Sequence, residues 1–499
     1  MGRVLTNNTA LSFTVETSLG TAGDTWTSLE PNDIGTYGAT TTTVAREPIS
    51  KDRARRKGTI TDLESAVEFE SDLTVSAMSD FGEGFVFASS PTAILRFNNT
   101  SFANSSDLCS VPALSAAQAG MLTYAAAGAK SLVYLGGYGS FDGVYPLAAQ
   151  PVTSDTELEI DGTGITTSFS TDPSRSIEVA GVELGASDCT IAVSGSTVTL
   201  TSAADVSDFA TLGLTAGMMV FIGNRSTTTG SRGFARVVSV ASNVVPLDKA
   251  DATLVAGSGI SDISVMFGQL YRNVSTDDAS FIERSYQFEL AMPNLGAAAA
   301  TGYEYAKGNF ANTLSLNVPL ADKATMSFGF VGTDTEVPTT TQKTHTTEVE
   351  PSLTEAFNTS SDVLRLRVTD TDETAMTSCF KDFTLSLNNN VSPERCIGTL
   401  GAEFMNTGNF LVDLEAEVLF TDEDVVSAIR NNDTVTLDAV IRNNNGAVAV
   451  DIPSLTLGDG AKSFPVNESV TISLSGQSFN DATLGTSVGI STIPGAPAA

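Results

Sequence analysis

Two short stretches of the chain alternate regularly between apolar and polar residues. In AVEFESDLTV (66–75) and LVDLEAEVLF (411–420), nearly every second residue is apolar, and carboxylates occupy most of the positions between. Successive side chains of a β-strand point to opposite faces, so each stretch is predicted to form a strand with one apolar and one acidic face. The acidic faces consist of Glu68, Glu70, Asp72, Asp413, Glu415 and Glu417.

The surroundings of the two acidic strands are also similar. Each is preceded by Gly-Thr and an apolar residue, and each is followed by a candidate helix, starting at Ser79 and at Thr421. Ser and Thr are favoured helix N-caps, and the neighbouring acids suit the positive end of a helix. The pentapeptide TLSLN occurs at 313–317 and again at 384–388. These recurrences predict a tandem duplication of one unit, a β-sandwich with a helix.

The middle of the chain differs from the two ends. It is rich in Gly, Ser and Thr, with short strand-like segments such as CTIAVSGSTVTLTS between turn residues. We therefore expect a mainly β protein with a few short helices. It should consist of a discontinuous first module (1–145 and 271–335), an inserted small β-barrel or sandwich on the outer surface (146–270), a second module (336–490) and a flexible tail (491–499).

Residue patterns that carry catalysis or bind cofactors are scarce. His345 is the single histidine, which makes Ser-His-Asp and Cys-His catalysis improbable. The four cysteines form no CxxC pair, and the Gly-rich GNRSTTTGSRG lacks the P-loop lysine. TDTDE (369–373) lacks the EF-hand spacing, so a solvated turn is favoured over a calcium site. We predict no enzymatic activity, no metal and no cofactor.

Segments that would address the chain to a membrane are not evident. The N-terminal region has no apolar core of signal-peptide length. The longest apolar run, AGMMVFIG (216–223), is far shorter than the roughly 20 residues that a membrane-spanning helix requires. The sequence therefore predicts a protein that neither spans a membrane nor leaves the cell by a signal peptide.

The positive charge of this acidic chain is concentrated in one segment. Its 26 Lys and Arg against 58 Asp and Glu give 26 − 58 = −32, yet six cations fall within AREPISKDRARRKG (45–58). A solvated loop is one interpretation. Nucleic-acid binding is weaker, because no aromatic residues are interleaved and the overall charge repels phosphates. We favour an arm that docks on an acidic neighbouring subunit through Arg46, Lys51, Arg53, Arg55, Arg56 and Lys57.

The acidic strand faces also allow two interpretations. Charge on an exposed strand can simply prevent edge-to-edge aggregation. However, selection for solubility alone more often mixes charges of both signs, and here the same single-sign pattern occurs in both proposed units. A functional acidic surface is therefore favoured.

Several stretches, taken in order, resemble a known family. These are VETSLGTAGDTWTSLEP, ISKDRARRKG followed by AVEFESDLTVSAMSDF, SFIERSY followed by NTLSLNVPLADKATMSFGFVG, and SGQSFNDATLG. Their order resembles the tail tube proteins of long, non-contractile-tailed phages, in a family built as a tandem pair of tube folds. The resemblance covers most of 1–100 and 280–490, and the zone at 146–270 departs from it.

The resemblance implies a structural virion protein, made in the host cytoplasm, whose copies form stacked rings around a channel. Trimeric rings with pseudo-sixfold symmetry are expected, with hexameric rings as the alternative. The acidic faces would line the lumen, so that double-stranded DNA passes without specific binding, and the basic arm would reach the adjacent ring. The tape measure, tail terminator and distal tail proteins would be partners. A surface-layer or adhesin-like protein that binds through the insertion is the competing hypothesis.

Overall fold

The computed structural model describes most of the chain. The described part is residues 3–497, apart from 50, 52–53, 91–95, 99, 103–107, 112–128, 155, 162–164, 166, 186, 188, 203–208, 226–229, 296–299, 352–353, 371–374, 378 and 422. Strands dominate it, which confirms the predicted mainly β class. Among these residues, no helix combines the length and apolar character needed to cross a bilayer.

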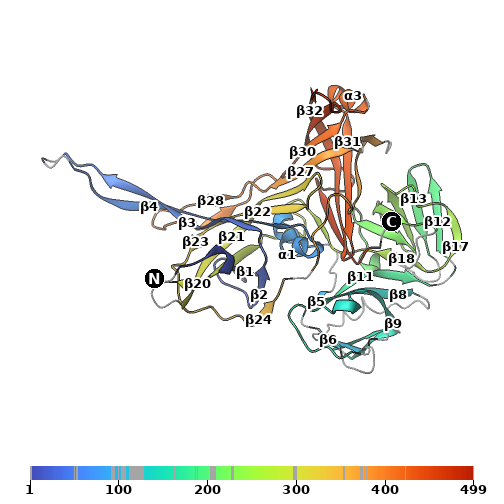
Figure 1. The fold of residues 1–499 in the computed structure, drawn as a ribbon, viewed down its shortest axis with the longest axis horizontal. Helices are drawn as coiled ribbons and strands as arrows, with labels where there is room; N and C mark the ends of the chain where they lie inside the picture. Colours follow the sequence, from blue (N-terminus) through green and yellow to red (C-terminus); the bar gives the residue numbers. More distant parts are fainter. Residues whose placement is uncertain are drawn as a thin grey trace.

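One large sheet joins strands from both ends of the chain (Figure 1). Each strand pairs with its neighbour in the order that follows. The order is β3 (Asp33–Arg46), β4 (Arg56–Asp72), β22 (Thr325–Gly332), β21 (Ala300–Pro319), β27 (Phe380–Asn388), β30 (Leu411–Leu419), β33 (Thr471–Ser478) and β32 (Gly446–Ser463). Both acidic stretches therefore form strands of one sheet.

The first and second halves of this sheet have the same order of elements. The chain runs β1–β2–β3–β4–α1–β20–β21–β22 in one half and β25–β26–β27–β30–α3–β31–β32–β33 in the other, and corresponding strands have corresponding partners. This is the arrangement that a duplication would produce, although the duplication itself stays a prediction. The additional elements are β1 (Ala10–Val15), β2 (Thr25–Leu29), β20 (Ser285–Leu295), β25 (Val363–Thr369), β26 (Ala375–Thr377), β31 (Thr434–Asn443), α1 (Val75–Val86) and α3 (Asp424–Asn431).

Between α1 and β19 (Leu270–Arg272) the chain builds a second sheet. The change of sheet lies between α1 and β5, earlier than the predicted boundary at residues 145–146. The strands of this sheet are β5 (Arg96–Asn98), β6 (Ser101–Phe102), β7 (Leu108–Ser110), β8 (Ala129–Gly136), β9 (Gly143–Ser154), β10 (Glu157–Ile160), β11 (Ser176–Leu184), β12 (Cys189–Ser194), β13 (Thr197–Thr201), β14 (Met219–Gly223), β15 (Gly233–Val237), β16 (Val244–Asp248), β17 (Gly257–Ile260) and β18 (Ile263–Met266).

The end of the described chain is part of the structure. Residues 489–494 form the buried strand β34, which pairs with β32 and with β19 (Leu270–Arg272). A strand therefore enters the segment predicted as a flexible tail, because Ile490 and Ile493 both bury their side chains. Short elements complete the fold: β23 (Asp334–Thr335), β24 (Thr347–Val349), β28 (Ser392–Glu394), β29 (Phe404–Asn406), and the 3₁₀ turns η1 (Thr6–Asn8), η2 (Gly139–Phe141) and η3 (Phe209–Leu212).

An aromatic core fixes α1 against the sheet. Phe81 of α1 lies 5.8 Å from the ring of Phe69 and 5.3 Å from that of Phe328. The helix can approach this closely because Gly84 has no Cβ, which would otherwise lie 2.2 Å from the hydroxyl of Tyr286. The helix begins at Val75 rather than at the predicted Ser79, since the hydroxyl of Thr74 accepts a hydrogen bond from the amide of Ala77. α3 likewise begins three residues after the predicted Thr421, at Asp424.

Asp80 is a partly buried acid on α1. Burial raises the pKa of its carboxyl to about 6, and the nearby Arg96 opposes this effect. Since the unfolded chain releases this proton near pH 4, Asp80 destabilises the fold increasingly as the pH rises from 4 to 6, and most above pH 6. Asp80→Asn should raise the free energy of unfolding by about 1–3 kcal/mol at pH 7 and leave it unchanged at pH 3.

Urea denaturation of the Asp80→Asn variant at both pH values measures this effect. The matched control is Asp24→Asn, at an exposed position, which should change little at either pH. A stability gain of the same size at pH 3 and pH 7 would show that the carboxyl's protonation is not the cause.

Candidate assembly surfaces

The strand registers place both acidic triads on one face of the continuous sheet. Glu70 lies opposite Ser327, and Asp413 lies opposite Ser386. Between them, Ser315 faces Ser327 on one side and Ser386 on the other. Because residues directly opposite each other share a face, this row of polar side chains runs unbroken from β4 to β30. The neighbouring row on the other face is apolar and contains Phe69, Phe328, Leu314, Leu387 and Val412.

The carboxylates of this acidic face differ in their exposure to solvent. Glu68, Asp413 and Glu415 are exposed, and Glu70 and Glu417 are partly buried. Thr36 donates a hydrogen bond of 3.0 Å to Glu68, which holds that carboxylate on the surface. Within the described residues, no group of His, Cys, Asp or Glu side chains is placed to hold a metal ion. The face therefore presents negative charge and small hydroxyl groups.

Asp72 differs from the other five predicted acids. It lies at the end of β4, where its carboxylate forms a 2.7 Å ion pair with Lys323 and accepts a hydrogen bond from Asn32. Its charge is therefore partly compensated. The sequence alternation alone could not show this, because Lys323 is brought in from the distant turn between β21 and β22.

The basic segment forms the far end of a long hairpin. β3 and β4 extend well beyond the body of the molecule, as the blue strands of Figure 1 show. Arg46 ends β3, Arg56 and Lys57 begin β4, and Lys51 lies in the connecting turn. Arg55 pairs with the exposed Glu47 at 2.8 Å. Arg53 lies outside the described residues. We call residues 41–61 the arm.

The arm also exposes apolar side chains. Val44 is 56% exposed and Ile60 is 51% exposed, and Ile49 near the tip is exposed as well. The projecting hairpin therefore exposes apolar side chains together with its cations. The Thr-rich, β-branched run TTTTV (40–44) is the sequence signal for this strand.

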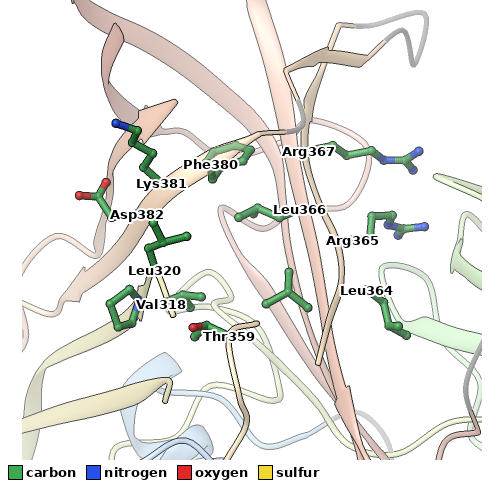
Figure 2. A pocket seen from close by; sticks show the side chains of 12 residues that line it. Val318, Leu320, Thr359, Leu364, Arg365, Leu366, Arg367, Phe380, Lys381 and Asp382 are labelled. Atoms are coloured by element: carbon green, nitrogen blue, oxygen red, sulfur yellow. The ribbon is translucent and has the colours of Figure 1, made fainter. Parts of the chain in front are cut away.

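A cavity of about 360 Å³ lies between β21, β25 and β27 (Figure 2). Leu366 and Phe380 point toward it, whereas Arg365 and Arg367 point to the other side of β25. Lys381 and Asp382, at the start of β27, also line the cavity.

Those arginines join a buried ion-pair network between the two sheets. Arg367 contacts Asp438 at 2.8 Å, and Arg365 contacts both Asp438 and, at 2.8 Å, Asp251 in the loop after β16 of the second sheet. Across the strand pair from Asp438 lies Asp451, which binds Arg236 of the second sheet at 2.9 Å. Burial raises the pKa of Asp451, and Arg236 opposes this. The second sheet is therefore anchored to β31 and β32 by charge as well as by packing.

Sequence reasoning missed this network. The available signal was a single acid inside each of two apolar strands, in TVTLDAVIRN and AVAVDIPSL. Buried acids require cationic partners, but pairing them with RLR at 365–367 depends on knowing which strands are adjacent.

Comparison with known proteins gives one result. The model of the family described as phage tail tube protein matches residues 6–491 of this chain, which is nearly its whole length. No curated protein matches it.

Proposed function

Because the chain belongs to the phage tail tube protein family, a family of structural virion proteins, we propose that its copies close into rings that stack into a hollow tube for phage DNA. The observation that carries this proposal is the continuous sheet with one apolar and one acidic face. The side chains of its apolar face are buried in the molecule's own core, while the acidic face lies toward solvent. The proposed role is structural rather than enzymatic, as expected for a member of this family.

Trimeric rings are the favoured symmetry. Each chain supplies two sets of strands in the same order, so three chains would give six similar sets around a ring. Head-to-tail contacts that close by rotation form rings, and stacking of rings forms a tube. Six chains per ring is the alternative.

The acidic face is proposed to line the lumen. DNA phosphates bind proteins by exchanging counterions for Lys and Arg, and a wall of carboxylates offers them no such partners. Glu68, Glu70, Asp413, Glu415 and Glu417 would supply this charge, with Asp72 contributing less because Lys323 partly compensates it. DNA would therefore slide without being held.

The remaining surfaces follow from this placement. The arm would reach an adjacent ring, where its cations meet the acidic surface of another copy. The second sheet would lie on the outside of the tube, as an inert decoration or a weak receptor contact, since the channel must stay open. Tape measure, tail terminator and distal tail proteins would contact the tube's interior and its two ends.

Reversing the lumen charge should slow DNA release without preventing assembly. Glu68, Asp413 and Glu415 are exposed, so their replacement by Lys should leave the fold intact. Phosphates would then bind the wall, and ejection at low salt should slow by on the order of tenfold or more. Phage carrying the triple variant would be compared in a DNA-ejection assay, with the triple Gln variant as the matched uncharged control.

Two results would count against this placement. Normal ejection by the Lys variant would argue that these residues do not face the DNA. Loss of tubes in the Gln variant would show that the carboxylates serve assembly instead. Negative-stain micrographs of the purified protein separate the competing surface-layer hypothesis, which predicts flat sheets or monomers rather than tubes.

A further inference from the structure

The arm leaves the main sheet at a definite residue. β4 pairs with β22 only as far as Ser65, and beyond this residue β3 is its only partner among the described strands. A two-stranded ribbon is marginally stable by itself and twists strongly. The direction in which the arm leaves the body is therefore decided at residues 62–65, which we call the root of the arm.

A second hairpin packs against this root. It belongs to the connection between β27 and β30, residues 389–410, which has the same place in the second half of the sheet as the arm has in the first. β28 and β29 pair within this connection, which runs beside β3 and β4 (Figure 1). Val391 and Met405 pack with Phe310 of the body. We call residues 392–406 the second hairpin.

Arg395 joins the second hairpin to the root. Its Nε lies 2.7 Å from a carboxylate oxygen of Asp62, and its Nη2 lies 3.0 Å from one of Glu64. Because these acids are two residues apart, they lie on one face of β4. A planar guanidinium that binds two carboxylates restricts their geometry more than a single point charge does. The backbones are also close here, since a Cβ at Gly401 would lie 2.8 Å from the carbonyl oxygen of Thr333.

The exposure of these groups separates positioning from stability. The Arg395 side chain is 37% exposed and that of Glu64 is 68% exposed, so water screens their interaction and it adds little to the stability of the fold. The orientations of a projecting ribbon differ little in energy, however, and a weak contact at the root is enough to select one of them.

We propose that Arg395 is a positioning residue for the arm. By holding Asp62 and Glu64, it makes the second hairpin a support that sets the direction of the arm. The second half of the chain thereby orients the contact surface of the first half. A preset direction lowers the entropy that the arm loses when it docks. The orientation is a property of the single chain, and only its consequence for stacking rests on the proposed function.

Distances between two spin labels, measured by electron paramagnetic resonance on the unassembled protein, test this inference. The exposed Cys379 and Cys396 are replaced by Ser, and labels are attached at Ala45→Cys on the arm and at Ser473→Cys on β33. The width of the distance distribution then reports how well the direction of the arm is defined.

Arg395→Glu is the decisive variant, because it places a third carboxylate beside Asp62 and Glu64. The distance distribution should become roughly twofold wider or more, since the ribbon loses its lateral support. The midpoint of urea denaturation should change little, because the replaced contacts are largely exposed. If Arg395→Glu folds poorly, Arg395→Ala must show the same broadening.

A charge swap provides the rescue. Asp62→Lys combined with Glu64→Lys should also widen the distribution, and adding Arg395→Glu to this pair should narrow it again. Arg430→Glu, at an exposed position on α3, is the matched control and should leave the distribution unchanged. An unchanged distribution in Arg395→Glu, or no narrowing in the swapped variant, would overturn the positioning role whether or not tubes form.

Tube assembly by the same variants separates this inference from the proposed function. Arg395→Glu should lower the tube yield by roughly tenfold, and the charge swap should restore it, because docking favours an arm that is already oriented. A wider distribution together with normal tubes would support the positioning role and refute its use in stacking. If the unmodified chain forms no tubes, the proposed function fails alone, since the distance measurement requires none.

Discussion

A chain in which residues 43–61 are replaced by Asn-Gly should fold normally and fail to form long tubes. Thr42 and Asp62 face each other in the register of β3 and β4, so a two-residue turn can close the shortened hairpin. The described residues of the deleted segment are exposed, apart from the partly buried Gly58, so little core contact is lost. The arm's contacts with a neighbouring ring would be lost completely. Negative-stain microscopy of tube length and yield measures the effect, which we expect to exceed tenfold.

A charge variant separates the two contributions of the arm. Replacing Arg55, Arg56 and Lys57 by Gln keeps the hairpin and its apolar side chains. Each exposed ion pair contributes only about 0.2–1 kcal/mol, so this variant should assemble with lower yield and stronger sensitivity to salt. Full-length tubes from the shortened chain would refute a role for the arm in stacking.

Asp438→Ala should lower the free energy of unfolding by about 3–5 kcal/mol, because it leaves the buried guanidinium groups of Arg365 and Arg367 without their shared carboxylate. Asp438 is completely buried in β31. Arg365 also binds Asp251, so the loss should loosen the second sheet from the first. Urea denaturation gives the stability change, and limited proteolysis shows whether the second sheet is released.

The control for this prediction is an ion pair near the surface. Arg395 contacts Asp62 and Glu64 at 2.7 and 3.0 Å while remaining partly exposed. Arg395→Ala should therefore cost about 1 kcal/mol or less. Equal losses of unfolding free energy from Asp438→Ala and Arg395→Ala would mean that the buried network contributes no more to stability than an ion pair near the surface. A double-mutant cycle of Asp438 with Arg367 would give their coupling directly.

Helix and strand boundaries show one limit of sequence reasoning. The sequence favours Ser79 as the start of the helix after the first acidic strand, because serine is a suitable N-cap residue. In the fold, Thr74 caps α1 five residues before Ser79, and Phe81 and Phe85 then both face the core. Several residues of this region can cap a helix, and packing against the sheet selects among them.

Patterns within short stretches of the sequence were sufficient to predict several features of this protein. Alternation with a period of two predicted the acidic strands, since it reflects a face that must be buried and a face that need not be. The recurrence of TLSLN indicated two related halves. The cluster of cations indicated a segment that the rest of the acidic chain would not bury. These are properties of short stretches, and a short stretch carries them wherever it lies in the fold.

Only the tertiary structure decided how these stretches meet. It placed both acidic triads on the same face, paired one TLSLN copy with the other, and partly compensated the charge of Asp72 with Lys323. It also joined Asp438 to arginines from β25. Strand adjacency depends on contacts between residues far apart in the chain, so a pattern within one strand cannot specify its neighbour. The sequence by itself determined which surfaces exist, and the pairing of distant strands decided where they lie.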